Sequence, residues 1–288
     1  MLQVARLART QLRDSAGLAI QFLSSQRNPD GGFRNRDGAS DLYYTVFGIE
    51  ALRALDAEVP FDSIVTYLRS FGEGDALDFV HLACLARAWA DLPRERAAGA
   101  PRRALVARLE VHRSGDGGYN AAPGSPRGTA YACFLALGAY QDLGEEMPEP
   151  HAMLPCLEAL RARDGGYSNQ PGAETGLTPP TAAAATLLRQ LGQAPDPALG
   201  RWLLARCHRS GGFFATDQSP IPDLLSTATA LHALAGLGVP VDGVKEPCLD
   251  FIDSLWTNRG GFYGSWADDS LDCEYTYYAL LALGHLSL

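Results

Sequence analysis

The chain has 288 residues, of which 47% are hydrophobic and 20% are charged, with 30 Gly and 18 Pro. This composition excludes a disordered tail, a coiled coil and a collagen-like chain, and it indicates a globular fold. The net charge of −9 would repel a phosphate backbone, so we expect no nucleic-acid partner.

The first segment of the chain does not have the pattern of a secretion signal. Arg6, Arg9 and Arg13 interrupt the region where a signal peptide needs an apolar centre. No run of about 18 apolar residues occurs elsewhere, so we expect no membrane span and a cytoplasmic location. The six cysteines are far apart and form no CxxC pair, which favours small core residues over a disulfide framework or a zinc knuckle.

A Gly-Gly-aromatic triplet recurs five times, at 31–33, 117–119, 165–167, 211–213 and 260–262. The first interval of 86 residues is about twice the later intervals of 48, 46 and 49 residues. A sixth repeat is therefore expected in the long gap, near Gly72 and Gly74. We expect one domain over 1–288 with repeats at approximately 1–57, 58–97, 98–147, 148–193, 194–241 and 242–288.

Each repeat is predicted to hold a helix, the triplet, a polar loop and a second helix. The second helices are expected, in chain order, at 41–55, 77–89, 128–140, 180–191, 223–237 and 272–284. They are apolar nearly all round, which indicates burial, whereas the first helices carry Arg and Glu on one face and should lie outside. The triplet suits a sharp reversal, because glycine reaches positive φ without a Cβ clash. The pattern predicts an all-α fold with two rings of helices.

The segment FLSSQRNPDGGF, at 22–33, resembles the QW-type repeat of squalene-hopene cyclases and protein prenyltransferase β subunits. The resemblance covers essentially the whole chain and implies a closed α/α toroid of six helical hairpins, an α6/α6 barrel. In that superfamily an apolar central funnel holds an isoprenoid, and the N-terminal ends of the inner helices carry the chemistry at its mouth. The β subunits also pair with a helical α subunit, so a helical partner subunit is implied.

Polar residues are distributed unevenly over the starts of the inner helices. Repeats 1, 2 and 6 supply Arg34, Arg36, Asp41, Tyr43, Tyr44, Asp78, His81, Asp268, Asp269, Asp272, Glu274 and Tyr275. Repeats 3 and 4 supply Thr129, Tyr131, Thr178, Pro179 and Thr181. If the ring closes, repeat 6 lies beside repeat 1. One wall of the mouth is then charged, and the opposite wall is uncharged.

The zinc pattern of the family is incomplete in simple repeat order. Family prenyltransferases use Asp-x-Cys at the fifth inner helix and a His at the sixth, whereas Leu225 and Tyr275 stand at the Cys and His positions here. One carboxylate, Asp223, cannot hold Zn²⁺ alone.

A permuted alignment matches better, with repeats 1 and 2 in the roles of the fifth and sixth. It implies a divalent metal, Zn or Mg, on Asp41, Asp78 and His81, with Tyr43 in place of the thiolate. Arg34 and Arg36 would then bind an allylic diphosphate.

The same candidate site residues are also consistent with purely structural roles. Asp41, Asp223 and Asp272 stand where helix N-caps are expected. His81 on an apolar helix is often a hydrogen-bonded core histidine, and Arg34 and Arg36 could be solvated loop charges. The tyrosines Tyr43, Tyr44, Tyr131, Tyr275 and Tyr278 are expected to contact substrate as cavity lining, where a ring face can steady a carbocation.

An acid of the protonating cyclases has no direct counterpart in this sequence. DDSLD, at 268–272, resembles a DDxxD motif of another fold, but its first residues are expected in a loop. No DxDD is present, so Asp272 or Glu274 would have to stay protonated through burial.

Three functions are consistent with the sequence. The first is a prenyltransferase-like enzyme that holds the isoprenoid of an allylic diphosphate in the funnel, with Asp41 at the reaction centre. The second is a terpene-cyclase-like enzyme that uses the acidic wall, including Asp272 and Glu274. The third is a toroid without catalysis that binds an isoprenoid or a protein partner.

Overall fold

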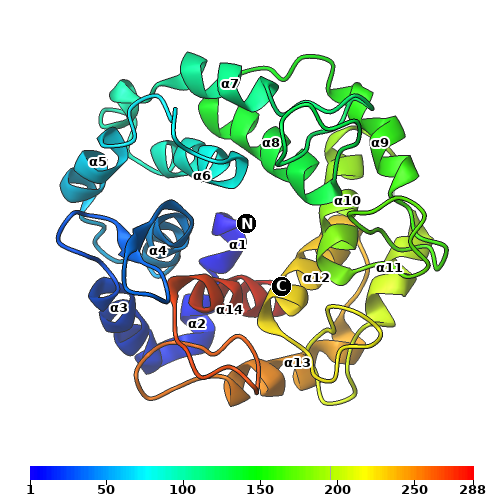
Figure 1. Ribbon diagram of the computed structural model, residues 1–288. Helices are drawn as coiled ribbons and strands as arrows, with labels where there is room; N and C mark the ends of the chain where they lie inside the picture. Colours follow the sequence, from blue (N-terminus) through cyan, green and yellow to red (C-terminus); the bar gives the residue numbers. More distant parts are fainter. Residues whose placement is uncertain (195) are drawn as a thin grey trace.

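The computed structural model describes residues 1–194 and 196–288. Within them, two concentric rings of helices surround a central hole (Figure 1). The inner ring contains α4 (Leu42–Ala54), α6 (Phe79–Ala90), α8 (Ala130–Leu143), α10 (Thr178–Gln190), α12 (Leu224–Gly236) and α14 (Cys273–Leu286). The outer ring contains α3 (Ala16–Ser25), α5 (Phe61–Arg69), α7 (Arg102–Glu110), α9 (Met153–Ala159), α11 (Pro197–Leu204) and α13 (Asp242–Ser254). This arrangement confirms the predicted all-α toroid.

The ring is closed by contact between its last and first inner helices. Each inner helix packs against its two neighbours in the ring, and α14 packs against α4. Repeat 6 therefore lies beside repeat 1, as the sequence predicts for a closed ring.

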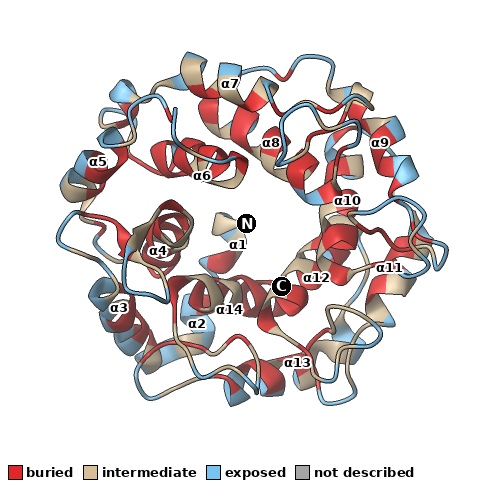
Figure 2. Ribbon diagram, viewed as in Figure 1, coloured by how far each residue is buried: buried red, intermediate tan, exposed pale blue. Residues whose placement is uncertain are grey.

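Burial follows the apolar pattern of the sequence. The inner helices are buried on most faces, and the outer helices expose one face to solvent (Figure 2). The inner helices are rich in small residues, which lets them approach each other closely while large side chains such as Phe33 and Trp89 fill the space between the rings.

The Gly-Gly-aromatic triplets form the reversals that the sequence predicts. The first glycine has a φ of 98° at Gly31, 85° at Gly117, 91° at Gly165, 84° at Gly211 and 89° at Gly260. A Cβ at Gly31 would also lie 2.1 Å from the carbonyl oxygen of Ser63. These positions require glycine for conformation, and Gly31 requires it for space as well.

The aromatic residue of each triplet locks the loop onto the next inner helix. All five aromatic side chains are buried. The backbone N–H of Phe33 donates to Thr45 Oγ1 at 2.9 Å, and that of Phe213 donates to Thr227 Oγ1 at 2.9 Å. The same bond recurs at Thr181 and Thr276, while Cys133 Sγ is the acceptor in repeat 3.

One short antiparallel sheet lies in the loop of repeat 1. It pairs β1 (Phe33–Arg34) with β2 (Ser40–Asp41), with Phe33 opposite Asp41. The pairing brings the charged loop between the strands over the start of α4.

Two short N-terminal helices precede the outer helix of the first repeat and were not expected from the pattern. These are α1 (Leu2–Ala5) and α2 (Ala8–Leu12). The first packs against α14 and α4 and lies across the far end of the central hole (Figure 1). Short 3₁₀ turns at Arg13–Ser15, Ala97–Gly99 and Pro150–Ala152 complete the described elements. None of the helices in the described residues is long and apolar enough to span a bilayer.

Candidate functional site

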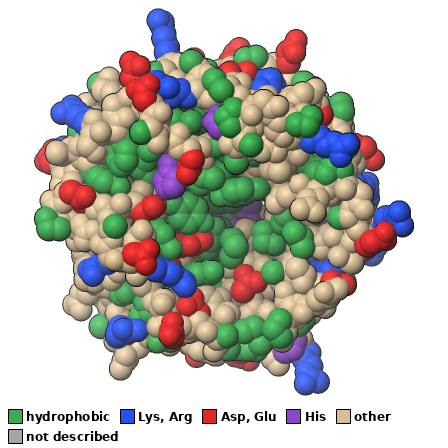
Figure 3. Space-filling view, in the orientation of Figure 1, with side chains coloured by type: hydrophobic (Ala, Val, Ile, Leu, Met, Phe, Trp, Pro, Cys, Tyr) green, Lys and Arg blue, Asp and Glu red, His purple; other side chains and the backbone are tan. Residues whose placement is uncertain are grey.

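A cavity of about 340 Å³ occupies the centre of the inner ring. Its size falls in the range of roughly 300–1,000 Å³ that is common for small-molecule sites. Hydrophobic side chains line the hollow in Figure 3. The aromatic members of the lining are Tyr43, Phe47, Tyr131, Phe134, Tyr277 and Tyr278.

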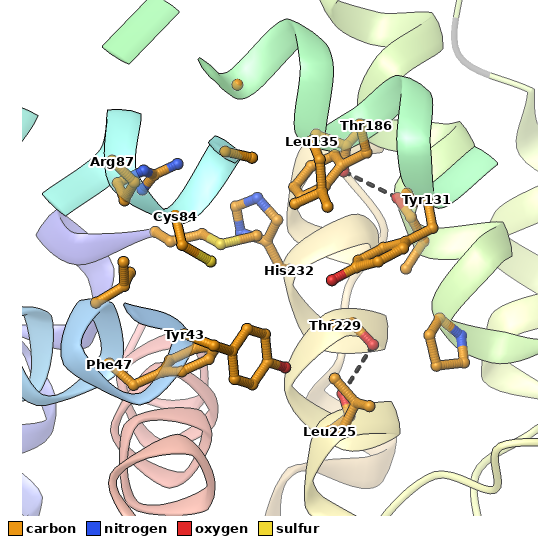
Figure 4. Close-up of a pocket in the computed structure, with 18 of the residues that line it drawn as sticks. Tyr43, Phe47, Cys84, Arg87, Tyr131, Leu135, Thr186, Leu225, Thr229 and His232 are labelled. Atoms are coloured by element: carbon orange, nitrogen blue, oxygen red, sulfur yellow. Dashed lines mark hydrogen bonds between the residues drawn. The ribbon is translucent and has the colours of Figure 1, made fainter. Parts of the chain in front are cut away.

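The aromatic side chains form a continuous wall on the side of α4 and α14. The ring centroids of Tyr43 and Phe47 are 4.9 Å apart, and those of Phe47 and Tyr278 are 5.3 Å apart. Tyr43 and Phe47 stand one helical turn apart on α4, so both project toward the cavity (Figure 4). Tyr131 enters from α8 on the other side.

A carboxyl group lies directly behind this wall at the mouth. The hydroxyl of Tyr43 donates to Glu274 Oε1 at 2.7 Å. The pKa of Glu274 is raised to about 7, chiefly by burial; the hydrogen bond from Tyr43 opposes this shift and the negative Asp272 adds to it. A large fraction of Glu274 therefore keeps its proton at neutral pH, where an ordinary glutamate is ionised.

Two neighbouring acidic residues pair with one arginine, although burial raises the pKa of one of them, Asp272, against the effect of this pairing. Arg36 Nε donates to Asp272 Oδ2 at 2.9 Å, and Arg36 Nη2 donates to Asp268 Oδ2 at 2.8 Å. Although burial opposes it, this pairing holds the pKa of Asp268 below its usual range. Asp272 also accepts the N–H of Tyr275 as the N-cap of α14. Arg36 thus joins repeat 1 to repeat 6.

The three predicted metal ligands meet at the start of α6. His81 Nδ1 lies 2.9 Å from Asp78 Oδ1, and His81 Nε2 lies 3.4 Å from Asp41 Oδ2. Asp78 and Asp41 also cap α6 and α4. Burial lowers the pKa of His81, but the hydrogen bonds to Asp78 and Asp41 and the negative charges of these two residues together outweigh it, so the net shift is upward.

These three residues do not fit a metal site. Both ring nitrogens of His81 already face a carboxylate. Among the described residues, no group of three or more His, Cys, Asp and Glu side chains is arranged to hold a metal ion. The divalent metal stays a prediction.

Arg34 and Arg36 lie in a separate polar cleft of about 580 Å³. The cleft is formed by the end of α3, the loop of repeat 1 and the loop before α14, and it shares no lining residue with the central cavity. Arg34 Nη2 donates to the carbonyl of Ser25, and its Nε is buried without a partner among the described residues.

The predicted tyrosines divide into two groups. Tyr43, Tyr131 and Tyr278 line the cavity, whereas Tyr44 and Tyr275 do not appear in its lining. Tyr275 instead packs beneath Arg36, whose guanidinium carbon lies 5.4 Å from the ring centroid.

The far end of the cavity holds a charged cluster that sequence reasoning missed. Arg87 Nη1 donates to Glu50 Oε1 at 2.8 Å, and Arg87 Nε donates to Asp142 Oδ2 at 2.7 Å. All three line the cavity. Beside them, His232 Nδ1 lies 3.1 Å from His285 Nε2, and burial lowers the pKa of His232 to about 3. The available signal was the presence of charged residues in the second halves of three otherwise apolar helices, α4, α6 and α8.

A comparison with protein-family models finds one match that spans most of the chain. The prenyltransferase alpha-alpha toroid domain matches residues 2–85, 100–215 and 181–287. No curated protein matches the chain by sequence.

Solved structures share the architecture at low sequence identity. The type II terpene cyclase MstE from Scytonema, in complex with geranylgeranyl dihydroxybenzoate, has a TM-score of 0.65 and 16% identity over 97% of each chain. A GH76A alpha-1,6-mannanase from Salegentibacter sp. HEL1_6 has a TM-score of 0.64 and 12% identity over 95% of this chain and 98% of its own. At such identities the likeness shows the fold alone, because the same fold occurs in a terpene cyclase and in a mannanase.

Proposed function

The chain belongs to the prenyltransferase alpha-alpha toroid family, and on that premise we propose that it is a terpene-cyclase-like enzyme, which cyclises an isoprenoid by protonating it. The observation that carries this proposal is the hydrogen bond between Glu274 and Tyr43, because it joins a protonated acid to the aromatic wall of an apolar cavity. The structural relative MstE binds geranylgeranyl dihydroxybenzoate as its substrate, which supports an isoprenoid as the substrate class.

Glu274 is the best-suited proton donor of the three predicted catalytic residues. Asp272 is paired with Arg36 and only 2% exposed, so its carboxylate is already committed. Asp41 accepts the backbone N–H of Tyr43 at 2.7 Å as a helix cap. Glu274 combines a pKa of about 7 with a position one hydrogen bond from the cavity lining. When it gives up its proton, the bond from the Tyr43 hydroxyl stabilises the carboxylate that forms.

The reaction starts at the end of the isoprenoid that lies near the mouth. Glu274 does not itself line the cavity, so its proton enters beside or through the hydroxyl of Tyr43, to which it is hydrogen-bonded. The proton adds to the terminal double bond, or to the oxygen of a terminal epoxide, and leaves a cation on the adjacent tertiary carbon. The π electrons of the next double bond attack this carbon and form a ring bond. Loss of a proton from the last cation ends the sequence, and Glu274 regains a proton from solvent. The product is an isomer of the substrate.

The cavity lining suits the intermediates of such a reaction. The faces of Tyr43, Phe47 and Tyr278 can stabilise a carbocation through their electron density, each by about 0.5–2 kcal/mol. The surrounding apolar side chains keep water away, and water would otherwise capture the cation.

Turnover in D₂O tests the protonation directly. The purified protein is incubated with farnesol, geranylgeraniol and their terminal epoxides, and the products are analysed by mass spectrometry. From the two alcohols we expect cyclic products that contain one deuterium on the carbon that Glu274 protonates. The epoxides report ring formation only, because deuterium on oxygen exchanges with water. Cyclic products of the alcohols without deuterium would refute protonation as the first step.

A pair of variants assigns the donor. Glu274→Gln keeps the shape and the partner but has no acidic proton, so we expect product formation to fall by at least about 100-fold. Tyr43→Phe retains the ring and loses only the hydroxyl, so a smaller loss is expected. Asp41→Asn is the matched control, because an amide can still cap the helix. An activity of Glu274→Gln equal to that of the wild-type chain would remove Glu274 from the mechanism.

A prenyltransferase-like activity is the second candidate, because Arg34 and Arg36 line a polar cleft of their own. It predicts release of diphosphate from farnesyl diphosphate in the presence of an acceptor, with no deuterium in the product. Arg36→Ala should then weaken binding of the diphosphate far more than binding of farnesol.

The remaining expectations are tested with the same preparation. Binding of an isoprenoid without turnover would favour the toroid without catalysis. The molecular mass in solution after co-purification tests the helical partner subunit, and the cytoplasmic location stays a prediction.

A further inference from the structure

The cluster at the far end of the central cavity has the geometry of a binding site. Tyr43 stands in the first turn of α4, whereas Glu50, Arg87 and Asp142 stand near the C-terminal ends of α4, α6 and α8. In Figure 4, Arg87 accordingly lies away from Tyr43 and Leu225. We propose that Arg87 binds the uncharged, oxygen-bearing end of the isoprenoid substrate. This inference rests on the proposed function and adds the chemical class of the substrate's second end.

Arg87 has hydrogen-bonding capacity that the protein does not use. Nη1 donates to Glu50 and Nε donates to Asp142, whereas Nη2 has no partner among the described residues. The side chain is 35% exposed, although it projects from an inner helix, and it lines the cavity. Its free N–H groups are therefore accessible to a molecule inside the cavity, where a substrate oxygen can accept a hydrogen bond from them.

The charges around Arg87 select against an anionic partner. Glu50 and Asp142 already balance the guanidinium on two sides, and their side chains are 4% and 18% exposed. The adjacent pair of Arg53 and Asp91, with Nη1 and Oδ1 2.5 Å apart, adds another cation. However, burial and the nearby Glu50 raise the pKa of Asp91 well above its usual range. The N-terminal amine of Met1 also lines the cavity, and burial lowers its pKa. The cluster therefore has three basic groups, Arg53, Arg87 and this amine, against the three carboxyl groups of Glu50, Asp91 and Asp142, and has no excess of basic groups to attract an anion.

The helix ends reinforce this selection. The C-terminal ends of α4, α6 and α8 direct partial negative charge toward the cluster. A carboxylate or diphosphate placed against Arg87 would be a further anion beside Glu50 and Asp142. Either ligand group would also lose its hydration in an apolar cavity. A hydroxyl or carbonyl oxygen avoids these costs. The substrate class is therefore an isoprenoid alcohol, aldehyde, ketone or ether. Its oxygen lies beside Arg87 at the far end of the cavity, and its terminal double bond lies near Glu274.

Gly138 provides a way to cover Arg87 without disturbing its ion pairs. It lies on α8 and lines the cavity, and a Cβ added there would lie 4.0 Å from Arg87 Nη2 with no closer neighbour. Gly138→Ala is therefore expected to fold, since alanine favours the helix, and its methyl group restricts access to the free N–H groups. Arg87→Met removes the donor itself but leaves Glu50 and Asp142 without a partner.

The experiment compares three isoprenoid ligands of equal carbon-chain length that bind to the full-length protein. Binding of farnesol, of farnesoic acid and of the hydrocarbon that lacks the hydroxyl is measured at pH 8 by isothermal titration calorimetry. For the wild-type chain, we expect farnesol to bind roughly 10- to 100-fold more tightly than the hydrocarbon, as for a hydrogen bond to a charged group. Farnesoic acid should bind more weakly than farnesol.

The variants then assign the preference to Arg87. Gly138→Ala should reduce the advantage of farnesol over the hydrocarbon by at least about 5-fold, and Arg87→Met should abolish it if that variant folds. Equal binding of farnesol and the hydrocarbon by the wild-type chain would overturn this inference, as would tightest binding of farnesoic acid. The proposed cyclisation would survive both results. Failure of all three ligands to bind would overturn the inference and the proposed function together.

Discussion

Glu274 gives the stability of the folded chain a specific dependence on pH. Its pKa is raised from 4.5 to about 7 in the folded chain, chiefly by burial. Because the folded state holds this proton more tightly than the unfolded state, the contribution of Glu274 to stability is greatest below pH 4.5 and is lost as the pH rises to about 7. Glu274→Gln removes the titrating group. The substitution should therefore stabilise the chain at pH 8 relative to the wild-type chain, and this advantage should disappear at pH 4.

The size of the effect follows from the two pKa values. Their difference corresponds to about 3 kcal/mol of unfolding free energy at pH 8. Glu274 is half-buried at the mouth rather than fully enclosed, so solvent screening reduces the expected gain to about 1–3 kcal/mol.

Urea unfolding at pH 4 and pH 8 measures this difference, since the slope with denaturant concentration should be equal for both chains. Glu146→Gln, at an exposed position between α8 and α9, is the matched control and should change little at either pH. An equal effect of Glu274→Gln at both pH values would refute the raised pKa, and with it the argument for Glu274 as the acid.

Two further substitutions test the architecture by denaturant unfolding. Gly31→Ala should cost about 3 kcal/mol or more, because Gly31 has a φ of 98° and an added Cβ would collide with a backbone oxygen. Gly38→Ala, with a φ of 88° and open space around it, should cost only about 1–2 kcal/mol, and equal losses would disprove the role of the close approach. Arg36→Ala should cost about 2 kcal/mol, because Asp272 is 2% exposed and loses its charged partner. Arg9→Ala breaks only an exposed pair and should cost less than about 0.5 kcal/mol, so similar values for the two arginines would contradict the proposed closure of the ring by Arg36.

Local features of the site were predictable where their cause is local. Asp41, Asp223 and Asp272 were expected as helix caps, and each accepts backbone N–H groups at the start of its helix. A cap depends on a side chain and the next three residues, so the sequence contains the necessary information. The aromatic lining was only partly predictable, since Tyr43 and Tyr44 are adjacent in sequence but only Tyr43 lines the cavity.

The pairing of charges could not be predicted because it depends on distant segments. Arg36 was expected to bind a diphosphate, yet its guanidinium is held by Asp268 and Asp272 from the opposite end of the chain. The direction of the loop between β1 and β2 decides this contact, and no periodic pattern encodes it.

The amino-acid sequence by itself determined the repeat, the two rings of helices and the position of each reversal. These features follow from apolar periodicity and from the unique backbone freedom of glycine, which act over a few residues. Only the tertiary structure decided which charged groups meet inside the ring. Glu50, Arg87 and Asp142 lie on three different helices, and closure of the toroid brings their donor and acceptor atoms within 3 Å of each other at one end of the cavity. The chemistry of the cavity therefore depends on distances between helices, which no single segment of the chain specifies.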